Sequence, residues 1–144
     1  SRSIPMIKDS ILIGNGPDTY GLHFPNNDYY GKLIGLRLEQ QVDKPHNLYL
    51  QIALNTGFLS LLSFVAIISI YLISSFRIYF KKREYLNLTD TIGLGVFFLV
   101  VIYLFTGISN DSIIAISPLF WTLIGVGYRL NQILQKESLK VSGQ

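Results

Sequence analysis

The apolar residues of this chain are concentrated beyond position 57. Residues 58–76 carry no charge over 19 positions, and a helix of that length reaches about 28 Å, close to the hydrocarbon thickness of a bilayer. Two more uncharged apolar runs follow at 92–109 and 112–128. Only Asn110 and Asp111 separate these runs, and Pro118 interrupts the second of them. The pattern predicts three transmembrane helices, at about 46–76, 92–109 and 112–128, of which the last two form a tight hairpin.

Residues 1–45 show no such pattern. Turn-forming residues gather at 14–18 and again at 23–28, and residues 29–41 fit a strand and a helical face equally well. Pro45 suits the first turn of the first membrane helix, with Asp43 or Lys44 as its cap. We therefore predict an all-α membrane protein, in which an irregular segment at 1–45 precedes a three-helix region at 46–128 and a tail at 129–144.

The charges predict an orientation. The 77–91 loop carries four basic and two acidic residues, the 129–144 tail three basic and one acidic, and the turn at 110–111 a single acid. Because basic loops remain in the cytoplasm, the 77–91 loop and the tail are expected there. Three crossings then place residues 1–57 and Asp111 on the extracytoplasmic side of the cell membrane.

The amino-acid composition narrows the class of protein further. Hydrophobic residues make up 49% of the 144, the formal charge is only +3, and there is no cysteine. These values argue against a soluble enzyme or a nucleic-acid binder and exclude a disulfide framework. The chain opens Ser-Arg-Ser without a signal-peptide pattern. We expect it to be an internal or C-terminal piece of a longer multi-spanning bundle, whose upstream helices are partners of this segment.

His46 and Asn47 are the first candidates for chemistry, because they stand where the polar segment meets the membrane. A helix start disfavours imidazolium and attracts anions. It would therefore suit a neutral histidine that deprotonates a hydroxyl beside a phosphorylated leaving group. Asn47 adds an amide that could orient a substrate or the histidine. The alternative is a histidine in a polar interfacial loop without chemistry.

Four other residues offer weaker signals. Asp18 is either a turn cap or a substrate contact, and Asp111 is either a hairpin tip in water or a functional acid near the membrane. Arg37 has the fork geometry that suits a diphosphate, although a solvated surface charge is the simpler reading. His23 fits a loop residue, and the irregular spacing of His23, Asp28 and His46 gives only weak support for a metal site.

The spacing around His46 resembles a family signature. His46-Asn47, nine residues and Gly57 are similar to the H-N-x9-G-x-x-G motif of the bacterial O-antigen ligase and O-antigen polymerase family, with Ser60 in place of the second glycine. Upstream, the run Leu12-Ile13-Gly14-Asn15-Gly16-Pro17-Asp18-Thr19-Tyr20 looks like that family's L-x-G-x-G-x-x-x-F/Y segment. The resemblance covers most of residues 10–128.

This resemblance implies the C-terminal portion of a membrane glycosyltransferase of the cell envelope. Such enzymes transfer a glycan from a polyprenyl-diphosphate donor to a sugar hydroxyl of an acceptor glycan or glycolipid, without metal or cofactor. His46 matches the family's proposed general base. A surface- or capsular-polysaccharide polymerase fits slightly better than a lipopolysaccharide ligase. The piece alone is expected to be inactive, because donor-binding arginines lie partly upstream.

A non-enzymatic component of polysaccharide export or assembly is the competing hypothesis. Transport sites use polar groups or broken helices at mid-membrane, and Ser117 with Pro118 is the feature of this kind in the sequence. In that case His46 would tolerate substitution.

Overall fold

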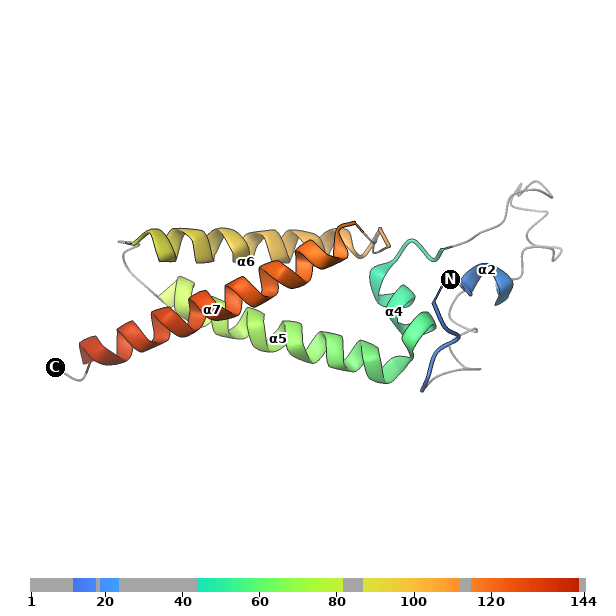
Figure 1. The fold of residues 1–144 in the computed structure, drawn as a ribbon, viewed down its shortest axis with the longest axis horizontal. Helices are drawn as coiled ribbons and strands as arrows, with labels where there is room; N and C mark the ends of the chain where they lie inside the picture. Colours follow the sequence, from blue (N-terminus) through green and yellow to red (C-terminus); the bar gives the residue numbers. More distant parts are fainter. Residues whose placement is uncertain (1–11, 18, 24–43, 82–86, 112–114, 143–144) are drawn as a thin grey trace. The chain divides into compact units, whose positions relative to one another are not determined.

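A computed structural model describes residues 12–17, 19–23, 44–81, 87–111 and 115–142. Within these ranges the chain is helical and contains no strand, which confirms the predicted all-α class. In chain order the helices are α2 (Tyr20–His23), α4 (Leu48–Thr56), α5 (Phe58–Lys81), α6 (Leu88–Thr106) and α7 (Ser117–Ser142) (Figure 1).

The chain divides into two compact units. The first comprises residues 1–64 together with 107–112, and the second comprises residues 65–106 together with 113–144. The first unit holds α4 and the segments at its two ends, including the turn after α6. The second holds most of α5 together with α6 and α7.

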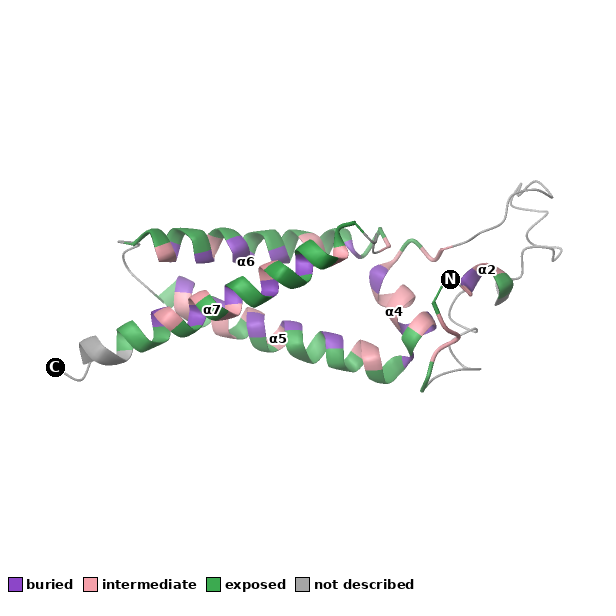
Figure 2. Cartoon of the chain, viewed as in Figure 1, coloured by how far each residue is buried: buried purple, intermediate pink, exposed green. Residues whose placement is uncertain are grey.

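Within the described part of the chain, two helices, α5 and α6, are long and apolar enough to cross a membrane. Only 22% of the apolar window of α5 and 28% of that of α6 are buried, and exposed residues cover much of both helices (Figure 2). A core helix of a soluble protein would bury most of such a surface. This exposure therefore indicates a membrane location for α5 and α6.

The predicted continuous helix over 46–76 is wrong. The structure has two helices there, α4 and α5, separated by Gly57 at φ 89° and ψ 169°. Pro45 and Lys44 precede the helix and do not begin or cap it, because the cap is Asn47. An L-residue rarely adopts a positive φ, so a glycine at this position allows the chain to leave one helix and start another at once.

The third predicted span, at 112–128, also differs from the helix in the structure. α7 begins at Ser117, so Pro118 lies in its first turn, where the ring interrupts no helix. It then continues without a break through the expected tail to Ser142. α7 is not among the helices long and apolar enough to span a membrane. The feature that favoured a transport site, a helix broken at Pro118, is absent from the described part of α7.

In the second unit, buried polar side chains join α5 to α7. The Tyr79 hydroxyl donates to Asn131 Oδ1 at 2.9 Å, and Asn131 Nδ2 donates to Ser75 Oγ at 2.8 Å. Tyr79 also packs with Phe97 of α6 and Leu134 of α7. Because buried polar groups are costly when unpaired, these bonds fix how α5 and α7 meet.

Candidate functional site

Helix α4 is the centre of the candidate site. Its N-cap, Asn47, has extended dihedral angles (φ −154°, ψ 118°), and its Oδ1 accepts a hydrogen bond from Leu50 N at 2.9 Å. Leu48, Ala53 and Leu54 are buried. An asparagine before an apolar run is a strong helix-start signal. The cap therefore lies three residues beyond Lys44 and four beyond Asp43, the two positions expected from Pro45.

The same asparagine binds the turn that follows α6. Asn47 Nδ2 donates to Ile108 O at 2.7 Å, and the neighbouring Leu48 N donates to Gly107 O at 2.8 Å. Both polar atoms of the Asn47 side chain are thus engaged in holding backbone. We expected a substrate contact at Asn47, whereas the structure gives it a positioning role at the start of α4.

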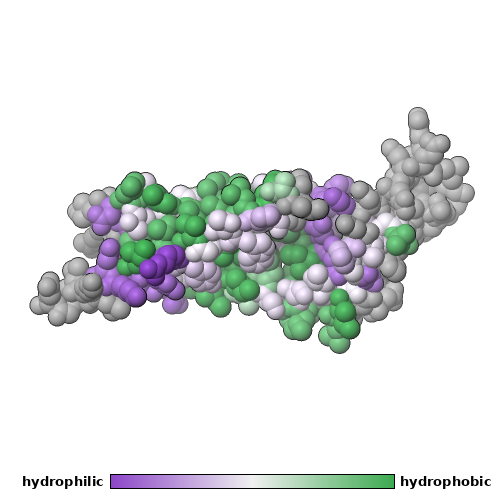
Figure 3. Space-filling model, viewed as in Figure 1, coloured by the Kyte–Doolittle hydropathy of each residue, from purple (hydrophilic) through white to green (hydrophobic). Residues whose placement is uncertain are grey.

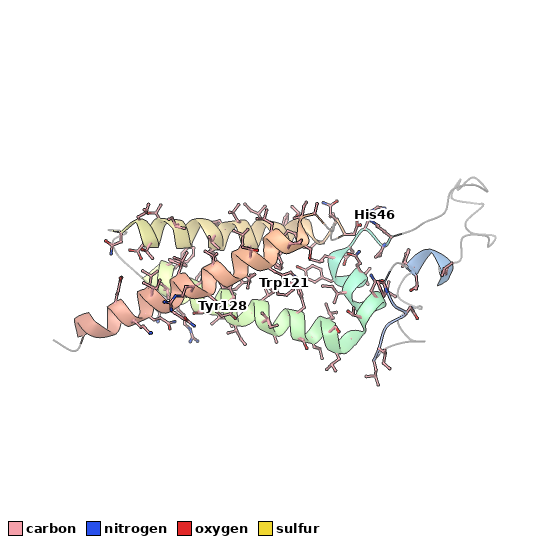
Figure 4. All side chains as sticks on the ribbon, viewed as in Figure 1. His46, Trp121 and Tyr128 are labelled. Atoms are coloured by element: carbon pink, nitrogen blue, oxygen red, sulfur yellow. The ribbon has the colours of Figure 1, made fainter. Side chains whose placement is uncertain are left out.

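Asp111 is brought to His46 by this turn. The distance between Asp111 Oδ1 and His46 Nδ1 is 3.4 Å, and Asp111 Oδ2 lies 3.4 Å from Lys44 Nζ. The Asp111 side chain is 14% exposed, whereas that of His46 is 72% exposed. His46 lies beside the start of α4 (Figure 4). The partly shielded Asp111 carboxylate therefore contacts the Nδ1 side of an imidazole ring that is otherwise largely exposed.

His46 adopts a left-handed backbone conformation, with φ 47°. Histidine is among the non-glycine residues enriched there, but the conformation is uncommon and persists only when neighbouring contacts maintain it. The cap at Asn47 and the pair with Asp111 provide such contacts. His46 precedes the cap, so it lies outside α4, and the helix is not the element that carries it.

This arrangement assigns different tasks to the two ring nitrogens. A carboxylate opposite Nδ1 favours a proton on that nitrogen, which donates to Asp111, over a proton on Nε2 alone. Nε2 then carries the lone pair and can accept a proton from a bound hydroxyl. A partly shielded acid beside Nδ1 orients the imidazole in the way that the aspartate of a Ser-His-Asp triad orients its histidine.

Two opposing effects act on the pKa of Asp111. Burial of the carboxyl raises it, but the hydrogen bond from its own backbone N–H and the nearby Lys44 and His46 side chains lower it by more. The net result is a pKa below the ordinary value. Asp111 is therefore ionised at neutral pH and available as the negative partner of His46.

The other end of α4 is closed by the upstream glycine segment. Asn15 N donates to Leu54 O at 2.7 Å and Gly16 N donates to Asn55 O at 3.0 Å, which satisfies two terminal carbonyls of the helix. A Cβ on Gly14 (φ 73°) would lie 2.6 Å from the backbone of Asn55. The glycine segment thus closes the C-terminal end of the nine-residue helix whose N-terminal end is capped by Asn47.

Several expected site residues stay untested. Asp18 and Arg37 lie outside the described residues, and His23 is the last residue of α2. Lys44, considered as a helix cap, pairs with Asp111. Sequence reasoning missed the joint role of Asn15 and Gly16 in closing α4, because no local pattern links this segment to a helix about 40 residues downstream.

Comparisons with protein-family models, curated proteins and solved structures give no match.

Changing Asn47 to aspartate should remove one of its two side-chain hydrogen bonds and keep the other. Aspartate keeps the oxygen that caps α4 but lacks the Nδ2 donor to Ile108 O. We expect α4 to remain helical by circular dichroism, while the 107–111 turn becomes more accessible to labelling at an introduced Ser109→Cys. Asn47→Ala should lose the cap as well, at about 0.5–2 kcal/mol. Equal labelling of Asn47→Asp and the unaltered chain would show that the turn does not depend on this donor.

The Asp111 pair should weaken in acid. The carboxyl pKa is lower in the folded chain, so its contribution is complete above the unfolded value of about 3.9 and is lost as pH falls through the folded value. The difference in thermal stability between the unaltered chain and Asp111→Asn should therefore shrink as the pH falls below about 4. Using the difference between two chains cancels the other carboxyls. A difference that stays constant to pH 2 would contradict the pairing.

Proposed function

We propose that the protein is part of a membrane glycosyltransferase that polymerises or ligates surface polysaccharide, with His46 as general base. The observation that carries this is the exposed His46 ring, held at Nδ1 by the shielded Asp111. Additional support comes from the family-like segments at both ends of α4 and from two helices apolar enough to span a membrane. Asp111 is a positioning residue in this proposal.

The reaction needs one proton acceptor and a good leaving group. An acceptor sugar hydroxyl gives its proton to His46 Nε2, and its oxygen forms a bond to the anomeric carbon of the donor. The bond from that carbon to the diphosphate oxygen breaks, and the electron pair leaves with polyprenyl diphosphate. A base adjacent to the reacting hydroxyl contributes about 10²–10⁴-fold to such a step.

The proposal includes a location and a set of partners. Residues 1–57 and the turn carrying Asp111 face the extracytoplasmic side, where a lipid-linked glycan is presented, and the basic 77–91 loop faces the cytoplasm. Upstream helices of a longer bundle complete the donor site. Arg37 remains our candidate for the diphosphate, because guanidinium binds phosphate oxygens in pairs, and Asp18 our candidate for the glycan.

The class of function is tested by glycan transfer itself. Membranes that contain the full-length protein, supplied with a polyprenyl-diphosphate-linked oligosaccharide and an acceptor glycan, should release polyprenyl diphosphate and form a longer glycan. The same membranes from a strain lacking the gene serve as the control. A component of export would move the glycan across vesicles without changing its length, and that result would overturn the proposal.

A further inference from the structure

The basic end of α5 carries an exposed aromatic surface. The Phe76 and Phe80 rings are stacked with centroids 4.6 Å apart, and Phe80 meets Phe98 of α6 edge to face at 6.5 Å. These three side chains are 56%, 51% and 47% exposed. Behind them, Phe97 is buried and contacts both Phe80 and Phe98. We call the exposed surface of Phe76, Phe80 and Phe98 the aromatic patch.

Two exposed cations stand beside this patch. Arg77 and Lys81 follow Phe76 and Phe80 by one residue each, so both pairs are spaced by four and lie on adjoining stripes of the helix. Arg77 is the first charge after the uncharged 58–76 run. Among the residues described, the structure records no ion pair for either cation. In Figure 3 hydrophobic surface gives way to hydrophilic surface toward the C-terminal end of α7, within this same unit.

We propose that the aromatic patch with Arg77 and Lys81 is a binding site for an anionic phospholipid. The headgroup phosphate lies between the two cations, and an acyl chain covers the Phe76, Phe80 and Phe98 rings. This rests on the membrane location of α5 and α6 and is independent of the proposed enzymatic function.

Charge complementarity decides the occupant. Another apolar helix would cover the rings but would supply no counter-charge to the two exposed cations. A zwitterionic lipid would cover the rings but supply no net charge. A headgroup with one net negative charge satisfies both features, and each lysine or arginine near a membrane surface favours such a lipid about fivefold.

The test is lipid selectivity measured by electron spin resonance. The intact chain is placed in phosphatidylcholine vesicles with spin-labelled phosphatidylglycerol or spin-labelled phosphatidylcholine of the same acyl chain, and the fraction of immobilised label gives the relative association constant. We expect phosphatidylglycerol to be favoured at least fivefold. The double variant Arg77→Gln/Lys81→Gln should bring the ratio near one.

A matched variant controls for total charge. Arg129→Gln/Lys136→Gln removes the same two charges from exposed positions on α7 and should keep most of the selectivity. Phe80→Ser keeps every charge and should still lower phosphatidylglycerol binding severalfold. Equal loss in both charge variants, no effect of Phe80→Ser, or a ratio of one in the unaltered chain would each overturn the site.

Discussion

Replacing His46 by glutamine is expected to lower glycan transfer by the full-length protein about 10²–10⁴-fold, which is the usual contribution of a general base. Glutamine retains a polar side chain of similar reach but cannot take up a proton at neutral pH. Because His46 is exposed and lies outside α4, the variant should remain in the membrane at normal abundance. Chain length of the surface glycan and release of polyprenyl diphosphate are the two measurements.

The chain supplies its own control for this experiment. His23, in α2, is the other histidine of the chain. We expect the His23→Gln protein to transfer glycan at close to the normal rate. Asp111→Asn should give an intermediate loss, together with a changed pH profile of kcat/KM, because it alters the orientation of the base without removing it. Normal chain lengths from the His46→Gln protein would exclude His46 as the base.

A second large effect is expected at Gly57, where alanine should destabilise the first unit by about 2–4 kcal/mol, near the upper end for single substitutions. Gly57 has φ 89°, and a Cβ there would collide with the carbonyl oxygen of Leu12. A positive φ alone costs an L-residue about 1–2 kcal/mol. The remainder reflects displacement of the 12–16 segment that caps α4.

Glycines that lack such neighbours provide the comparison. A Cβ on Gly95 of α6 or Gly125 of α7 meets nothing within 4 Å. Alanine at either position should leave stability unchanged or increase it by up to about 1 kcal/mol through helix propensity. Thermal unfolding in detergent, followed by circular dichroism, measures all three variants. A Gly57→Ala midpoint equal to that of Gly95→Ala would refute the close approach of Leu12.

The hydrophobic pattern by itself predicted the helical class and two of the long helices. Uncharged runs at 58–76 and 92–109 correspond to α5 and α6, because an apolar stretch of this length has few alternatives to a helix. The ends were less predictable. α5 continues past Arg77 to Lys81 and α7 continues through Arg129, since a helix does not stop where its surface becomes charged.

The Gly57 break depended on contacts that no local pattern contains. The carbonyls at the end of α4 are satisfied by Asn15 and Gly16, from a segment far upstream. A single glycine inside an apolar run costs a helix only about 1 kcal/mol, so it does not by itself end the helix. Only the approach of the 12–16 backbone makes two helices the better solution.

In the candidate site, too, the sequence determined one part and the tertiary structure determined another. The sequence identified His46 through its spacing to Gly57, and it listed Asp111 as one acid among several. The tertiary structure selected Asp111, because Asn47 and Leu48 bind the backbone of the 107–108 turn and so carry that carboxylate to 3.4 Å from His46 Nδ1. The sequence motif determines which residues lie at the two ends of α4. The acid that pairs with His46 is determined by hydrogen bonds between segments distant in the chain.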